Sequence, residues 1–150
     1  LKLLLDAKAE IDLCDFEQRT ALLIAAYEGF SDCIPVLLDA GAAVDAQDED
    51  GQTALAIVAR HDDTESAQIL IDAQADLEVR NLKNRKPLMI AAREGHAAMI
   101  QLLLASNASL DARDDDNVNA LMLAAASGCV EALESLLEAV DADEDDDNDD

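Results

Sequence analysis

Two histidines and three cysteines are the side chains of this sequence best suited to hold zinc or to act as nucleophiles. Their spacing supports neither role. Cys14, Cys33 and Cys129 are far apart, and neither His61 nor His96 lies near a pair of cysteines. The sequence also lacks a phosphate-binding glycine loop, a nucleophilic-serine elbow, a zinc-protease histidine pair and a dinucleotide-binding glycine pattern. We therefore predict that the chain is no enzyme and holds no cofactor or metal.

Carboxylates are the other candidates for chemistry, because the chain has 34 acidic and only 10 basic residues. The acids that alternate between Asp143 and Asp149 are spaced as in a calcium loop, but the glycine and the final bidentate glutamate of such loops are missing. The triplet Asp114–Asp116 is more typical of a solvated turn than of a metal cage. The formal charge of −24 argues against binding to nucleic acid or to an anionic membrane.

The composition indicates which elements position these groups. The 150 residues are enough for one domain, and 51% of them are apolar, but there are only one Tyr, two Phe and no Trp, so the core must be aliphatic. Abundant Ala, Leu, Asp and Glu favour helices. No apolar run of about eighteen residues is present, so no membrane span is expected. An odd number of widely spaced cysteines suits the cytoplasm or the nucleus, where each is expected to be a small buried residue.

The sequence repeats with a period of thirty-three residues, without insertion or deletion. The segments TALLIAAYEGF, TALAIVARHDD, KPLMIAAREGH and NALMLAAASGC begin at Thr20, Thr53, Lys86 and Asn119, and each is followed by a second apolar segment. Each unit has the pattern of a helix, a turn, a second helix and an extended finger, and such units must stack to bury their apolar faces. We place a partial unit at 1–14, units that begin at residues 15, 48, 81 and 114, and a disordered acidic tail at 141–150.

The expected helix ends carry residue types that begin or stop helices. Pro87 lies in a first helical turn, where its missing N–H costs nothing. Asp62 stands in the second unit where the other units end their first helix with glycine. Pro35 falls inside a second helix and should distort its first turn. The other residues expected at helix ends are Thr20, Thr53 and Asn119 at the starts, and Gly29, Gly41, Gly95 and Gly128 at the ends.

The period and these segments resemble the ankyrin repeat, whose signature centres on Thr-Pro-Leu-His and Ala-Ala-x-x-Gly-His. The segment Ala91–His96, AAREGH, matches this signature directly, and the resemblance covers roughly residues 1–140. It implies an all-α ankyrin-repeat solenoid of helix-turn-helix units with β-hairpin-like fingers, four repeats in all after a partial N-terminal one. It also implies that His96 is the structural histidine of the turn, whereas the histidine of Thr-Pro-Leu-His is replaced in every unit.

Proteins that resemble this chain bind partners on the finger tips and on the exposed side of the first helices. Phe16 and Tyr27 lie on that face and are of a type that often anchors interfaces, although Phe16 has a second interpretation, packing on the next finger. Phe30, in a turn, is expected to be core, and His61 is expected to be exposed. Carried over position by position, the pattern predicts partner binding by Phe16, Arg19, Tyr27, Gln52, Arg60, His61, Lys83, Arg85, Arg93, Asp115 and Asp116.

Basic residues are concentrated in the third unit, where five of the ten lie between Arg80 and Arg93. Two interpretations are open. These bases either neutralise the acidic fingers on both sides, or form a patch in which Arg85 and Arg93 grip a carboxylate or phosphate with two hydrogen bonds each. In the second case the partner carries an acidic or phosphorylated element, and the acidic tail of the chain is a possible competitor.

The resemblance implies a protein-interaction scaffold that acts as a monomer and binds another protein through its concave face. One alternative is a regulatory or targeting segment of a larger multidomain enzyme. Another is an acidic chaperone or nucleic-acid mimic that holds basic proteins through its tail. Because the chain begins inside a unit, at Leu1, we expect further repeats before it. We also expect an exposed apolar edge there, through which two copies of the shortened chain could pair.

Overall fold

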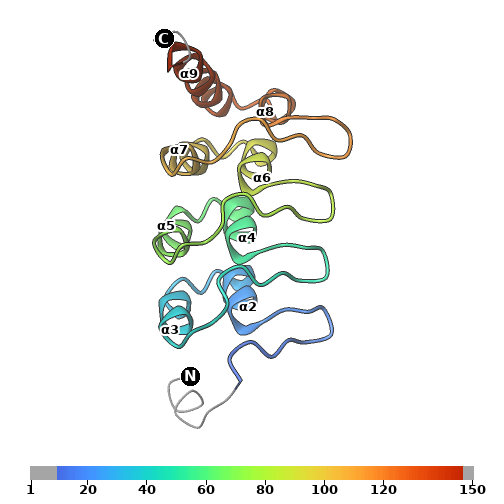
Figure 1. Cartoon of the computed structure of the whole chain (residues 1–150), viewed down its shortest axis with the longest axis vertical. Coiled ribbons are helices and arrows are strands. Elements are labelled where there is room, and N and C mark those ends of the chain that lie inside the picture. Colours follow the sequence, from blue (N-terminus) through green and yellow to red (C-terminus); the bar gives the residue numbers. More distant parts are fainter. Residues whose placement is uncertain (1–9, 147–150) are drawn as a thin grey trace.

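The computed structural model describes residues 10–146, with side chains as far as residue 142. Within these residues the chain forms helices and no strand, and four helix pairs stack in a single row (Figure 1). The predicted all-α ankyrin-type solenoid is therefore confirmed. The partial unit and the apolar edge expected at Leu1 fall mostly in residues 1–9, outside the described part. The helices are α2 (Ala21–Glu28), α3 (Cys33–Asp39), α4 (Ala54–His61), α5 (Thr64–Asp72), α6 (Pro87–Glu94), α7 (Ala97–Ala105), α8 (Ala120–Ser127) and α9 (Val130–Asp146).

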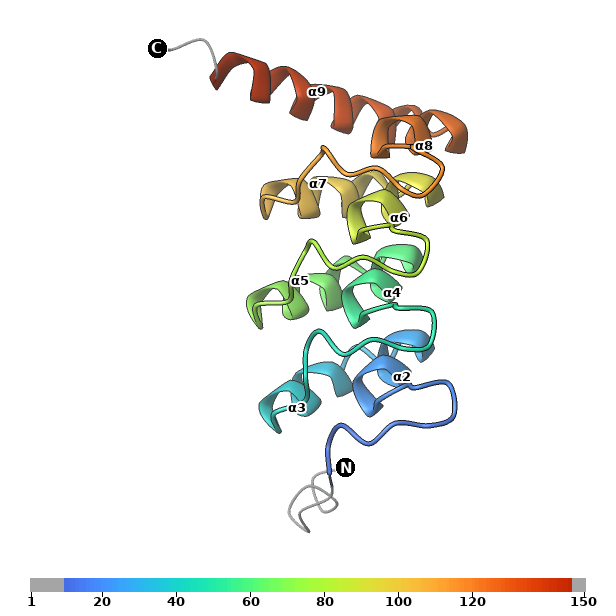
Figure 2. The same ribbon diagram turned by 45° about the vertical axis from the view of Figure 1, so that its right-hand side comes forward.

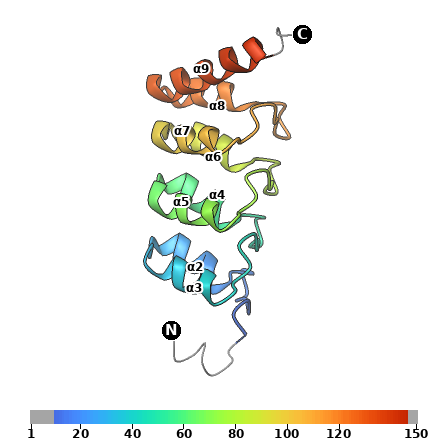
Figure 3. The ribbon, with the colours of Figure 1, turned by 60° about the vertical axis from the view of Figure 1, so that its left-hand side comes forward.

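Each helix packs on its partner in the same pair and on the equivalent helix of the next pair. The main contacts run along α2, α4, α6 and α8, and in a second row along α3, α5, α7 and α9 (Figure 1). Figure 3 shows the pairs stacked one above another. One continuous hydrophobic core extends from Leu22 to Leu136. Ala59 and Ala92 are completely buried between first helices, where a side chain of a single carbon lets the backbones come close. No helix in the described part is both long and apolar enough to cross a membrane.

The predicted N-caps of the first helices are confirmed. The side-chain oxygens of Thr20 and Thr53 accept hydrogen bonds from the backbone N–H groups of Leu23 (3.4 Å) and Ala56 (3.2 Å). Asn119 caps α8 in the same way, and Pro87 is the first residue of α6. Each cap of this kind stabilises a helix by about 1 kcal/mol, so these short helices depend on them.

One hydrogen-bond pattern builds each of the four fingers, at residues 15–19, 48–52, 81–85 and 114–118. In the second finger, Oδ1 of Asp48 accepts the N–H groups of Asp50 (3.0 Å) and Gln52 (2.8 Å). Asp15, Asn81 and Asp114 accept the equivalent pairs in the other fingers. These four residues, the finger anchors, are those at which the sequence places the starts of the units. Each finger then turns back through a left-handed residue at position 18, 51, 84 or 117.

A second set of carboxylates links consecutive units. Asp12 accepts the backbone N–H of Ala43 (2.9 Å), and Asp45 accepts that of Asp76 (3.0 Å). Glu78 accepts the N–H of Ser109 (2.9 Å) at the next step. Part of the acidity of the chain is therefore structural, because these carboxylates satisfy backbone donors that have no partner in a helix or a sheet.

The second helix of the first unit starts late. α3 begins at Cys33, whereas α5 and α7 begin at the positions equivalent to Ser31. Pro35 lies in the first turn of α3, so this shortened start agrees with the predicted distortion. The prediction that Phe30 is core is wrong, since its side chain is 57% exposed in the turn that precedes α3.

The cysteines are not the buried residues that we expected. Cys14 is exposed, while Cys33 and Cys129 are partly exposed, and all three are free thiols. Cys14 lies on the extended segment that leads into a finger, where the equivalent residues Gln47 and Arg80 are also exposed. The prediction failed because it rested on the average burial of cysteine and not on this position in the unit.

The acidic tail was predicted to be disordered from residue 141, but α9 continues to Asp146. Val140 stands where the earlier units end their second helix in a left-handed conformation, at Gly41, Gln74 and Asn107. A β-branched valine avoids that conformation, so the chain stays helical. α9 leads away from the fingers (Figure 2), which gives no support to the idea that the tail folds back onto the basic residues of the third unit. Residues 147–150 lie outside the described part.

The helix end at Asp62 offers a test of the repeat pattern. Asp62 is left-handed (φ 59°), and the Asp62→Gly substitution should stabilise the chain by about 0.5–1 kcal/mol in urea denaturation, because glycine adopts this conformation without strain. Gly95→Ala is the opposite case, since an added Cβ would lie 2.9 Å from Cβ of Cys129. That variant should lose stability. A loss in Asp62→Gly would contradict the interpretation.

Candidate functional site

A pocket of about 160 Å³ opens where the second and third fingers meet α4 and α6. Five of the eleven predicted binding residues line it, and they come from two neighbouring units. The structure therefore brings together residues that are up to forty-one positions apart in the sequence. The lining residues are Asp50, Gln52, Arg60, Asn81, Leu82, Lys83, Arg85, Ile90, Arg93 and Glu94.

Three of the five clustered bases have structural roles. Arg85 donates from Nε and from Nη2 to Oδ2 of Asp114, both at 2.8 Å, and only 14% of its side chain is exposed. Lys86 is buried and pairs with Glu78. Arg80 donates to the backbone oxygens of Asn84 and of Arg113 in the next unit. The interpretation as neutralising residues therefore holds for Arg85 and Lys86, which pair with acids, whereas Arg80 has a structural role without an ion pair.

Arg60, Lys83 and Arg93 differ from those bases. None of them forms a salt bridge with any residue whose side chain the structure describes. Arg60 and Arg93 hold equivalent positions in the last turns of α4 and α6, where a positive charge also compensates the helix dipole. Because α4 and α6 pack side by side, the two guanidinium groups project from neighbouring positions into the same pocket.

Gln52 was predicted at a finger tip, and the structure corrects this. Its backbone pairs with Asp48 across the base of the finger, and the whole residue is only 5% exposed. Its Oε1 is buried and accepts no hydrogen bond from the described residues. A buried acceptor without a donor costs free energy, so this side-chain oxygen adds nothing to the stability of the fold.

In the first unit, Phe16 and Arg19 have different environments. Phe16 is completely exposed at the finger tip, so the alternative in which it packs on the next finger is wrong. Arg19 is held by Asp15 and Glu17 of its own finger, each at 2.8 Å. The bond from Arg19 is the main reason why the pKa of Asp15 falls below its ordinary value.

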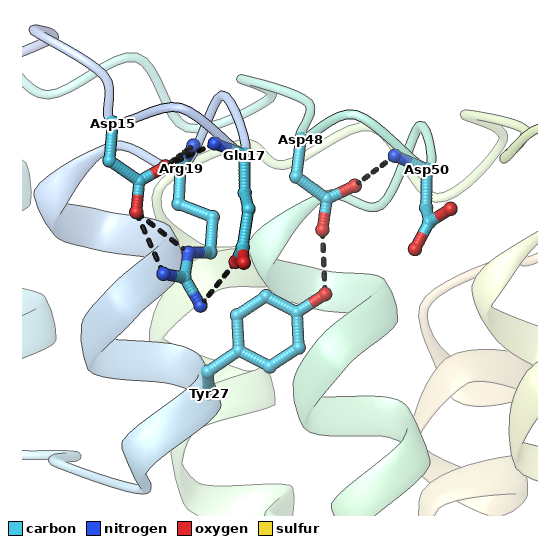
Figure 4. Close-up of polar contacts among 6 residues, drawn as sticks. All are labelled: Asp15, Glu17, Arg19, Tyr27, Asp48 and Asp50. Carbon is cyan, nitrogen blue, oxygen red and sulfur yellow. Dashed lines mark hydrogen bonds and ion pairs between the residues drawn. The ribbon is translucent and has the colours of Figure 1, made fainter.

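Tyr27 connects the first helix of its unit to the second finger (Figure 4). Its hydroxyl donates to Oδ2 of Asp48 at 2.6 Å, while the other oxygen of Asp48 holds its own finger. Burial, followed by the hydrogen bond and the negative charge of Asp48, raises the pKa of Tyr27 to about 12. Tyr27 therefore has a structural role in addition to any contact with a partner.

The histidines lie as predicted. Nε2 of His96 is 2.9 Å from the backbone oxygen of Arg60, so His96 joins the second and third units, and His61 is exposed at the end of α4. In the fourth finger, Asp115 and Asp116 are exposed. Burial of Asp114 acts against ionisation, but hydrogen bonds from Val118 and Arg85 lower its pKa overall. Within the described residues, no group of three or more His, Cys, Asp or Glu is arranged to hold a metal ion.

The other five lining residues, Asp50, Asn81, Leu82, Ile90 and Glu94, were not among the predicted binding residues. The signal for Asn81 was present, since the other finger anchors are all aspartates and only the third is neutral. Ile90 looked like an ordinary apolar position of a first helix. Its 5% exposure at the pocket depends on how the third finger lies over α6, which the sequence pattern does not specify.

The model of the family described as ankyrin repeats, in three copies, matches residues 1–81 and again residues 57–148. The chain belongs to the ankyrin-repeat family. The sequence matches no curated protein. Ankyrin repeats are generally protein–protein interaction modules without catalytic activity, and the pocket of this ankyrin chain lies between its fingers and its first helices.

The shifted pKa of Tyr27 predicts a loss of stability at high pH. The neutral phenol is favoured in the fold, so its contribution is complete below pH 10 and disappears as the pH rises towards about 12. Because Tyr27 is the only tyrosine and there is no tryptophan, tyrosinate absorbance reports this titration directly. Tyr27→Phe should lose about 1 kcal/mol at neutral pH and show less alkaline destabilisation. Titration of the folded chain near pH 10 would contradict the interpretation.

The unsatisfied Oε1 of Gln52 predicts an unusual response to mutation. Gln52→Met keeps the shape and removes the buried acceptor, so stability should be unchanged or should rise by about 1 kcal/mol in urea denaturation. Gln47→Met is the matched control. Nε2 of Gln47 donates to the backbone oxygens of Gly51 (2.7 Å) and Arg80 (3.2 Å), so its loss should destabilise. Equal destabilisation in both variants would show that Gln52 has a structural role.

Proposed function

We propose that this chain is a non-enzymatic scaffold that binds another protein through the concave face formed by its fingers and first helices. One observation carries the proposal. The pocket gathers three bases, Arg60, Lys83 and Arg93, that have no ion-pair partner among the described side chains of a strongly acidic chain. The other described bases without an ion pair, Arg80 and Arg113, donate to backbone oxygens instead. Three bases in one pocket whose side chains have neither kind of contact among the described residues support a role in recognition.

The partner is proposed to be a protein with an acidic or phosphorylated element, since the pocket offers guanidinium and ammonium groups as donors. Phe16, completely exposed at the tip of the first finger, is available as an apolar contact on the same side of the stack. The scaffold is proposed to act as a monomer in the cytoplasm or the nucleus, and its charge disfavours nucleic acid and anionic membranes as ligands.

A lysate experiment tests this function. The Arg60→Gln/Arg93→Gln variant should lose specific proteins that the wild-type chain captures, as read by mass spectrometry, because both guanidinium groups face the pocket. A hydrogen bond between a charged side chain and a partner contributes about 1.5–3 kcal/mol to binding, so loss of both arginines should lower capture at least tenfold. Urea denaturation of the variant checks that the fold is intact.

A matched control separates recognition from net charge. Gln68→Glu/Ala98→Glu changes the charge by the same −2, but on exposed positions of the second helices α5 and α7. Capture should survive in this control. Equal loss in both variants would mean that only net charge matters. Loss on removal of residues 141–150, but not in the arginine variant, would instead favour the acidic chaperone that holds basic proteins.

A further inference from the structure

The third finger has the opposite charge to its neighbours. Residues 81–85 carry two bases and no acid, whereas residues 48–52 and 114–118 each carry three acids and no base. The neutral anchor Asn81 contributes to this difference, because it accepts the N–H groups of Lys83 and Arg85 (3.0 Å each) as an aspartate does elsewhere. The fold would accept aspartate at position 81 equally well. The structure of the finger therefore does not require a neutral residue at position 81. The neutral side chain matters for the charge of the pocket.

The charges that line the pocket nearly balance. Arg85 is already neutralised by Asp114, which leaves three bases, Arg60, Lys83 and Arg93. Asp50 and Glu94 are the two acids of the lining, so three positive and two negative charges give a net charge of +1. This matches one carboxylate. A phosphate group with a charge close to −2 would leave an uncompensated negative charge in the pocket, and its larger charge costs more to remove from water.

We propose that this pocket receives the carboxylate of a single aspartate or glutamate in a linear segment of the partner protein. The inference rests on the proposed function and narrows it, since it selects a carboxylate over a phosphate. Arg60 and Arg93 lie at equivalent positions of adjacent helices and both line the pocket. A guanidinium group can bind a carboxylate with two parallel hydrogen bonds.

The size and walls of the pocket fit one amino-acid side chain. Its volume of about 160 Å³ is well below the roughly 300–1,000 Å³ of sites that hold free small molecules. Ile90 and the exposed Leu82 provide apolar surface for the methylene groups of an acidic side chain. Gln52 also lines the pocket, and its buried Oε1 has no donor among the described residues. A rotation of its amide towards the opening would let this atom accept a backbone N–H of the bound segment.

The finger anchor provides a substitution that tests charge without disturbing the fold. Asn81→Asp adds one negative charge to the lining and keeps the acceptor that Asp15, Asp48 and Asp114 supply in the other fingers. Asn107→Asp is the matched control. Asn107 is exposed, lies outside this pocket and is left-handed (φ 68°), a conformation that aspartate tolerates, as Asp62 shows.

The experiment is the selection of a random linear peptide library on the folded 150-residue chain, followed by fluorescence anisotropy of the synthetic consensus peptide. The consensus should contain one acidic residue whose change to the amide (Glu→Gln or Asp→Asn) weakens binding about tenfold or more. Asn81→Asp should weaken binding of the acidic peptide about tenfold but leave the amide peptide unaffected. Asn107→Asp should change neither by more than about twofold.

Three results would overturn the inference. They are a selection without an enriched acidic residue, an acid dependence that Asn81→Asp leaves unchanged, and tighter binding when phosphoserine replaces the acidic residue. A selected peptide without an acidic residue could still require Arg60 and Arg93, so that it does not bind the Arg60→Gln/Arg93→Gln variant. That result would overturn the proposal of a carboxylate ligand but would support binding on the concave face. If no peptide is enriched, the linear segment is wrong, while the lysate experiment continues to test the function by itself.

Discussion

The structure depends on one side-chain oxygen per unit, the oxygen of the finger anchor that accepts two backbone N–H groups. No helix or sheet ladder satisfies the backbone donors of a finger, and backbone bonds to the neighbouring finger, such as Glu49 N–H to the oxygen of Glu17, satisfy only some of them. Asp15, Asp48, Asn81 and Asp114 solve this problem with nearly the same distances, from 2.8 to 3.1 Å. The fingers can therefore form without a sheet, and each finger lies in a fixed position over the first helices.

The use of carboxylates as finger anchors makes the chain acidic. The positions of its few bases therefore indicate where a positive charge has a role. Aspartate is the residue that serves as anchor in three of four fingers, and further carboxylates at positions 12, 45 and 78 join consecutive units. A base near these acids has an obvious structural partner, as Arg19 and Arg85 show. Arg60, Lys83 and Arg93 form no such pair in the described part. The two arginines compensate helix dipoles, but no described acid holds any of the three side chains in place.

The sequence was sufficient to predict the fold, because helix caps and stops recur every thirty-three residues and depend only on local chemistry. Thr53 and Asp62 mark the two ends of α4 by the same rules that apply in the other units. The failures concern positions where one unit departs from the others. Val140 is β-branched and stands where the other units have a left-handed residue, so α9 continues beyond it. Phe30 is 57% exposed in the turn before α3, and the burial of a turn residue depends on what packs beside it, which the sequence of one repeat does not contain.

The site was predictable only in part, for the same reason. A position-by-position transfer from the ankyrin pattern selected Arg60, Lys83 and Arg93, but it also placed the buried Gln52 at a tip. Spacing along the chain shows which residues are equivalent, whereas the pocket forms only where the fingers and first helices of two stacked units meet. Its walls exist only while the second and third units are stacked. A ligand bound between them must therefore stabilise that contact by the free energy of binding, so recognition and the cohesion of the central repeats are thermodynamically linked.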